Sequence, residues 1–294
     1  MKQKIRIALL LMACPALLVP AQQKPPQIIL VPVAGPVCML EGGGGNIGVV
    51  ADDAGLLMID SMFEGVAAAV REAVKALPGG GHVRMLIDTH WHADHTDGNK
   101  AFGPGAVVIA HENVLPLVAK GQTLLGGQVE ALPAGAQPNL TFSDRLTIYA
   151  GGESIRLVHF PHAHTDGDTV VFLDGQKTVH MGDMFFNGMF PVLDFENGGD
   201  IDNWVCQLDT VLASLPAEAK IIPGHGRLGG VVELKAFRDM LETSANFVRE
   251  QMKAGKTLDE VKAMALPDSL EPWTKGFLSA PEWLEMVYRS LEKR

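Results

Sequence analysis

The stretch "DTHWHADHTDGN", residues 88–99, places three histidines and three aspartates within twelve positions. It follows the apolar run "VRMLI", which is typical of a buried strand, so the polar groups begin where that strand is expected to end. His90 and His92 are two residues apart and therefore point the same way in extended backbone. Two imidazoles on one side can bind one cation, whereas Asp94 and His95 lie farther on, where a turn can direct them toward a second.

Further candidate ligands follow three later strands. His164 lies in "PHAHTDGD", Asp183 in "HMGDMF" and His225 in "PGHG". Strand ends on one rim of a sheet can converge, and loops at such a rim carry chemistry. Neutral imidazole and carboxylate groups suit zinc at about 2.0–2.2 Å, and two metals about 3.5–4 Å apart can share a hydroxide. The cations would also keep the carboxylates ionised and the imidazoles neutral, which removes the repulsion within the crowded stretch.

Strand and helix patterns occur in both halves of the chain. The first half contains the short β-type runs "NIGVVAD" and "GLLMID" and the helical run "EGVAAAVREAVKALPGG". The second half contains expected hairpins within residues 140–160 and 168–183, then the helical run "DIDNWVCQLDTVLASL", with Asp202 as its expected N-cap. The pattern favours the α/β class, with two mixed β-sheets packed face to face and helices outside.

The expected domain organisation follows from the absence of linker-like composition in the central part of the sequence. Residues 22–36 are expected to form an N-terminal tether, and residues 37–230 a single catalytic domain. Residues 231–294 are expected to be a helical C-terminal extension of the same domain.

Residues 1–21 have the features of an export signal. "MKQKIR" gives a basic start, a short apolar run follows, and Val19 and Ala21 fit the small-residue rule for cleavage after Ala21. The run is too short and too interrupted by proline to span a bilayer, so no stable membrane insertion is expected. A lipid anchor at Cys14 is an alternative interpretation of the same segment. Either interpretation predicts a periplasmic or secreted protein.

The composition limits the class of partner. The formal net charge is −10, and it becomes −13 without residues 1–21, because Lys2, Lys4 and Arg6 are lost and no acid is. An acidic surface disfavours polyanions, so the expected partner is a small-molecule substrate and not a nucleic acid. Cys38 and Cys206 then remain; they allow one disulfide, but two buried thiols are the favoured interpretation.

The ordered motifs resemble a known family. His-x-His-x-Asp-His, followed by a lone His, a Gly-Asp and a Gly-His within roughly residues 37–230, is similar to the signature of the metallo-β-lactamase-fold hydrolases. The resemblance implies an αββα sandwich with a two-metal site on one rim, here followed by a helical C-terminal segment. It also implies that one metal is held by His90, His92 and His164, the second by Asp94, His95 and His225, and that Asp183 bridges them.

One position departs from the best-known zinc β-lactamases of that family. Those enzymes have a cysteine where Asp183 stands, and a lysine shortly after it that grips the substrate carboxylate, whereas residues 184–200 contain no lysine or arginine. A bridging aspartate resembles the thioesterase (glyoxalase II), lactonase and phosphodiesterase branches instead. The departure therefore disfavours a dedicated β-lactamase.

The resulting functional hypothesis is a binuclear zinc-dependent hydrolase. A metal-bridging hydroxide, oriented by Asp94, is expected to attack a small ester, thioester, lactone or β-lactam. The alternatives are an iron-dependent redox enzyme on the same scaffold, a phosphodiesterase or nuclease, and a non-catalytic zinc-binding protein. Iron or manganese are the alternative metals. Flavodiiron relatives favour a glutamate at the position of His92, which argues against that branch.

Other polar groups near the motifs have weaker signals. His159 and His180 lie in expected strands and are interpreted as hydrogen-bonded structural histidines, and His162 has at most a supporting role. Asp60 closes an expected strand and could orient a ligand or cap the next segment. The glycine run 42–45 lacks the ending of a phosphate loop, so a hairpin tip or flap over the site is expected.

Overall fold

The computed structural model describes residues 27–124 and 126–293, in which two β-sheets face each other. The first sheet has seven strands in the order β1-β2-β3-β4-β5-β6-β9, and the second has six in the order β10-β11-β12-β13-β14-β15. The first consists of β1 (Ile29–Ala34), β2 (Val37–Glu41), β3 (Ile47–Asp52), β4 (Gly55–Ile59), β5 (Val83–Ile87), β6 (Val107–His111) and β9 (Leu140–Phe142). The second consists of β10 (Arg145–Ala150), β11 (Glu153–His159), β12 (Thr169–Leu173), β13 (Thr178–His180), β14 (Lys220–Ile222) and β15 (Gly229–Gly230). Both sheets mix parallel and antiparallel pairs.

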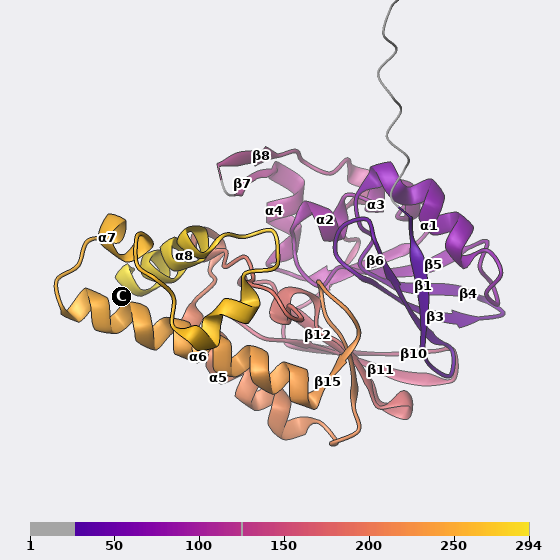
Figure 1. Ribbon diagram of the computed structural model, residues 1–294. Helices are drawn as coiled ribbons and strands as arrows, with labels where there is room; N and C mark the ends of the chain where they lie inside the picture. Colours follow the sequence, from indigo (N-terminus) through magenta and orange to yellow (C-terminus); the bar gives the residue numbers. More distant parts are fainter. Residues whose placement is uncertain (1–26, 125, 294) are drawn as a thin grey trace, which may run out of the picture.

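Helices cover the outer faces of both sheets, as Figure 1 shows. The α-helices are α1 (Ala67–Val74), α2 (Ala93–Thr96), α3 (Asn99–Phe102), α4 (Val114–Lys120), α5 (Ile201–Ser214), α6 (Val231–Lys253), α7 (Leu258–Lys262) and α8 (Ala280–Glu292). The 3₁₀ helices are η1 (Glu64–Val66), η2 (Ala134–Ala136), η3 (Asp174–Gln176), η4 (Gly182–Met184), η5 (Phe195–Asn197) and η6 (Asp268–Trp273). A small separate hairpin, β7 (Gln122–Leu124) and β8 (Gly127–Val129), lies beside α4.

The alternation of apolar residues along β4 explains the layered core. Leu57 and Ile59 point into the core between the two sheets, whereas Leu56 and Met58 point into the core beneath α1. Both faces of this strand are therefore buried, which is why its sequence is continuously apolar. A third core joins the second sheet to α5, α6 and α8, and these layers form the predicted αββα sandwich.

The ends of several strands meet on one rim. β5 ends at Ile87, immediately before the histidine-rich stretch, and β13 and β14 run parallel and end at His180 and Ile222. Parallel neighbours place their carboxyl ends at the same edge, so the segments after β13 and β14 lie together. The segment after β5, which belongs to the other sheet, meets them there, since His90 Nε2 is 3.6 Å from Asp183 Oδ2. The sheet topology thus brings residues 88–99, 181–186 and 223–226 to one place.

Several local expectations are corrected by the structure. Residues Ile29–Ala34, within the expected tether, form edge strand β1 paired with β2. Residues Leu140–Phe142, expected to form a hairpin, pair instead with β6 of the other sheet. Asp200, and not Asp202, caps α5 through its side chain. These differences concern pairing and capping, which depend on distant contacts and exact helix boundaries.

The two cysteines of the described residues are not paired. Cys38 is buried as expected, whereas Cys206 is exposed on α5, so the expectation of two buried thiols is wrong for Cys206. The expected signal, its cleavage site and Cys14 lie outside the described residues. Within residues 27–124 and 126–293, no helix combines the length and apolar character needed to cross a bilayer. The boundary between residues 230 and 231 stays a prediction.

Candidate metal centre

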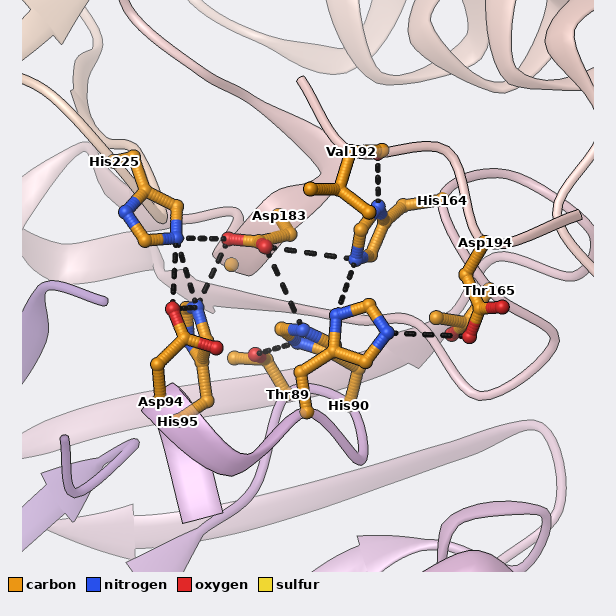
Figure 2. Close-up of polar contacts among 12 residues, drawn as sticks. Thr89, His90, Asp94, His95, His164, Thr165, Asp183, Val192, Asp194 and His225 are labelled. Carbon is orange, nitrogen blue, oxygen red and sulfur yellow. Dashed lines mark hydrogen bonds and ion pairs between the residues drawn. The ribbon is translucent and has the colours of Figure 1, made fainter. Parts of the chain in front are cut away.

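The structure brings all seven predicted ligands together, from four separate segments of the chain (Figure 2). They form two groups, and within each group one ligand atom from every residue lies within 4.8 Å of the others. The first group is His90, His92, His164 and Asp183, and the second is Asp94, His95 and His225. For the six residues other than Asp183, which the family resemblance assigns to both metals, this division is the one that the resemblance implies.

The carboxylate of Asp183 lies between the two groups and faces both. Its Oδ2 is 3.6 Å from His90 Nε2 and 3.5 Å from His164 Nε2. Its Oδ1 is 3.0 Å from His95 Nε2 and 3.4 Å from His225 Nε2. Each oxygen therefore belongs to one group of ligands, as a bridging ligand requires.

The contacts between ligand atoms fit cations of the size of zinc. Ligand atoms at about 2.0–2.1 Å from a tetrahedral zinc ion are separated from one another by about 3.3–3.4 Å. In the first group His164 Nε2 is 3.0 Å from His92 Nδ1, and in the second His95 Nε2 is 3.4 Å from His225 Nε2. Asp94 Oδ2 is 3.1 Å from His225 Nε2. Slight expansion would place each group around one ion.

Two buried atoms lack the partners that burial normally demands. His90 Nε2 is enclosed by protein and makes no hydrogen bond, and Asp183 Oδ1, although 3.0 Å from His95 Nε2, meets no donor in hydrogen-bonding geometry. A buried polar atom without a partner costs about 1–3 kcal/mol, so an arrangement of this kind needs another stabilising ligand. Both atoms point toward the space between the ligands, so cations there would satisfy them.

The second nitrogen of each buried histidine is held by a neighbouring oxygen. Asp60 Oδ2 lies 2.8 Å from His95 Nδ1 and also accepts a hydrogen bond from the Thr89 hydroxyl, at 2.9 Å. The Thr89 oxygen is in turn 3.0 Å from His90 Nδ1. One carboxylate thus orients a histidine in each group and favours the tautomer whose Nε2 is free to bind metal. Of the two roles considered for Asp60, orientation of a ligand is the one observed.

Asp194 is a second supporting aspartate, which no motif in the sequence had indicated. Its Oδ2 lies 3.1 Å from His92 Nε2 and accepts a 3.0 Å hydrogen bond from Trp91 Nε1, which leaves His92 Nδ1 facing the site. The carbonyl of Val192 lies 2.8 Å from His164 Nδ1. The buried loop "FPVLDF" therefore orients two histidines of the first group. Its one weak signal is a single aspartate among apolar residues.

Glycines allow the backbone to approach the ligands closely. A Cβ at Gly45 would lie 2.1 Å from His95 Cε1, and one at Gly224 would lie 2.0 Å from Asp183 Oδ1. The Gly45 N–H also donates to the Asp94 carbonyl at 3.0 Å. The run 42–45 is the β2–β3 hairpin tip, as expected, and it packs directly on the second group of ligands.

The two groups differ in charge without metal. Burial, and then the charge of His95, lower the pKa of His90 well below its usual value, and burial and His92 lower that of His164 to about 4. Burial also opposes charge at His225, but the carboxylates of Asp183 and Asp94 outweigh it and raise its pKa to about 9. They raise the pKa of His95 well above its usual value in the same way. At neutral pH His90 and His164 of the first group are therefore neutral, whereas His95 and His225 of the second group carry protons.

Zinc titration of the metal-free protein should show this asymmetry. A proton on a raised-pKa histidine must leave before the nitrogen binds metal, so affinity at the second group should fall as the pH drops below about 9. Calorimetry at pH 7.5 in buffers of different ionisation enthalpy should show roughly two protons released with the second equivalent, and fewer with the first. Equal release in both steps would contradict this assignment.

The remaining histidines lie away from the ligand atoms. His180 Nε2 is 3.1 Å from the Asn46 carbonyl, and the rings of His111 and His159 stack at 3.5 Å, so all three have structural partners. His162 is exposed and lies 3.1 Å from Asp166 Oδ1, where it contacts none of the ligands. The interpretation of His159 and His180 as hydrogen-bonded structural histidines agrees with their contacts.

Comparison with known proteins gives the family. Residues 40–234 match the sequence profile of the metallo-beta-lactamase superfamily. The 2,4-dinitroanisole O-demethylase subunit alpha of Nocardioides sp. (strain JS1661) is 26% identical over 82% of this chain and 70% of its own length. A hydroxyacylglutathione hydrolase of Nitrosococcus oceani is 26% identical over 50% of this chain and 49% of its own length.

A solved structure agrees on the fold. The metallo-beta-lactamase from Pontibacter korlensis superposes with a TM-score of 0.60 and 20% identity, over 74% of this chain and 99% of that one. The alignment with the hydroxyacylglutathione hydrolase covers about half the length of each of the two proteins. With the profile match over most of the sandwich and a cluster of histidines and aspartates suited to divalent metals, the chain belongs to the metallo-beta-lactamase superfamily and is a metal-dependent hydrolase.

Proposed function

We propose that the protein is a two-zinc hydrolase that cleaves a small ester, thioester, lactone or β-lactam. The observation that carries the proposal is the carboxylate of Asp183, whose two oxygens each face a different group of ligands. The donors are imidazole nitrogens and carboxylate oxygens, which suit zinc. Zinc ions bound there would supply a hydroxide nucleophile near neutral pH and would polarise the substrate.

Asp94 has the position and charge to orient the attacking water. Burial raises the pKa of an aspartate, but the positive charges of His95 and His225 lower that of Asp94 to about 2. It is therefore ionised at neutral pH and accepts hydrogen bonds only. Its side chain is 25% exposed, whereas that of Asp183 is 3% exposed, so Asp94 can reach a water that arrives with the substrate.

Two relatives suggest which substrates to test first. The name hydroxyacylglutathione hydrolase describes a thioesterase, and Asp183 fits the aspartate-bridged branch to which the sequence was compared. The name of the demethylase subunit describes cleavage of an aryl methyl ether, so 2,4-dinitroanisole is a second candidate. We further propose that the protein acts in the periplasm or outside the cell, on the basis of residues 1–21, with residues 37–230 as its catalytic domain.

A metal-reconstituted substrate screen tests the proposal. The full chain, stripped and reloaded with zinc, should hydrolyse at least one substrate of a panel of thioesters, lactones, esters, β-lactams and 2,4-dinitroanisole. Asp94→Ala, measured beside it, should lower turnover by about 100-fold or more, because the nucleophile loses its orienting carboxylate. Full activity of Asp94→Ala without bound metal would contradict the proposal. Two irons with oxygen-dependent turnover in the purified protein would favour the redox alternative.

A further inference from the structure

The metal centre opens to solvent on one side only. Among its seven ligands, the side chains of Asp94 and His225 are 25% and 15% exposed, and the other five are buried. A substrate must therefore approach the metal centre over these two residues, and it contacts the side chains that surround them.

An exposed aromatic ring lies beside this opening. Phe277 is 56% exposed, and its ring meets that of His225 edge-on, with centroids 5.6 Å apart. The buried ring of Phe186 stacks on His225 at 4.9 Å and lies 6.3 Å from Phe277. Phe186 and Phe277 thus flank His225, but only Phe277 presents a face to solvent.

The backbone around Phe277 is fixed against the loop that follows Asp183. The Phe190 N–H donates to the Trp273 carbonyl at 3.0 Å, and a Cβ at Gly276 would lie 2.6 Å from Met189 Cβ. Leu278, the next residue, is buried in the core. These contacts of Trp273, Gly276 and Leu278 hold the backbone around Phe277 in place, so the exposure of its ring is a property of the folded structure.

A second exposed ring lies near Asp94. Phe63 is 44% exposed, and a Cβ at Gly44 would meet Phe63 Cδ2 at 3.3 Å and Asp94 Cβ at 3.4 Å. Gly44 therefore lies close to both the Phe63 ring and Asp94. One apolar ring thus lies beside His225 and another near Asp94, and such rings would cover an apolar group that binds next to the open ligands.

We propose that Phe277, which lies between η6 and α8 and outside the family match, is a specificity-determining residue that binds an aryl or alkyl group of the substrate. The inference rests on the proposed hydrolase function and narrows its substrates to those with such a hydrophobic group. Burial of an aromatic face against a ring releases water from both surfaces and adds favourable ring–ring contact. A substrate without that group gains nothing from Phe277.

Small molecules that bind the metal ions but are not hydrolysed test the role of Phe277 separately from turnover. Acetohydroxamate and phenylacetohydroxamate share one metal-binding group and differ in the phenyl ring. We expect the zinc-loaded full chain to bind the phenyl compound at least about tenfold more tightly. Phe277→Ala should remove most of that preference, and Phe277→Leu should retain part of it. Tyr149→Ala is the matched control, since Tyr149 is an exposed aromatic on β10.

The same variants are then compared on acetyl and phenylacetyl thioesters of one thiol. Phe277→Ala should lower kcat/KM for the phenylacetyl thioester by about tenfold and leave that for the acetyl thioester within about twofold. An unchanged phenyl preference in Phe277→Ala, or equal losses for both compounds, would overturn the inference. If neither the two thioesters nor any other substrate of the panel is hydrolysed, the hydrolase proposal fails. If the tighter binding of phenylacetohydroxamate still depends on Phe277, the proposal that Phe277 binds an apolar group is supported even then.

Discussion

Asp183→Ala is expected to remove the binuclear centre. Both groups of ligands lose a carboxylate oxygen, and the negative charge that the four surrounding histidines share is lost as well. Replacing an outer partner of a ligand already costs about 10–100-fold in metal affinity, so loss of a shared ligand should cost more at each site. We expect bound zinc to fall from about two to below one per chain and kcat/KM to fall by about 10³-fold or more.

A surface aspartate gives the control for this variant. Asp174 lies in η3 and pairs with Arg156 in an exposed ion pair, so Asp174→Ala should keep both zinc ions and full turnover. Elemental analysis after gel filtration measures the bound zinc per chain, and initial rates on the best substrate of the panel measure turnover. Two tightly held zinc ions in Asp183→Ala would show that this carboxylate is not the bridge.

Gly45→Ala is expected to damage the centre without removing any ligand. The new methyl group would lie 2.1 Å from His95 Cε1, far inside van der Waals contact, so the imidazole must move. His95 is fully buried and held by Asp60, which leaves it little room. Displacement of a catalytic group by about 1 Å can cost about 100-fold in rate, and we expect a loss of at least that size in kcat. Zinc affinity should weaken at the second group first.

Gly65→Ala is the matched control, because it makes the same chemical change on exposed η1. A Cβ there would meet nothing within 4 Å. Rates and zinc affinity of Gly65→Ala should equal those of the unmodified protein, and circular dichroism should show both variants folded. Normal activity in Gly45→Ala would mean that the hairpin tip moves away from His95 at little cost.

The sequence was sufficient to predict which seven polar side chains lie together, because their order and spacing are local signals. His90 to His95 lie within six positions, and the other three ligands each follow a short apolar run. The sandwich followed from the same runs, since strands such as β4 are apolar on both faces and need cover on both.

What sequence reasoning missed depends on contacts between distant residues. His92 and Asp194 are 102 positions apart, and no pattern in the chain links them. The pairing of β9 with β6 was missed for a related reason, because alternation predicts a strand but not its neighbour. The exposure of Phe277 likewise arises from the way residues 273–278 pack against residues 189 and 190.

Two cations that share Asp183 can be located by anomalous diffraction from crystals of the zinc-loaded protein, recorded at the zinc edge. We expect two peaks about 3.5–4 Å apart, with one Asp183 oxygen and its own group of ligands at each. A single peak, or two peaks of which Asp183 contacts only one, would contradict this expectation.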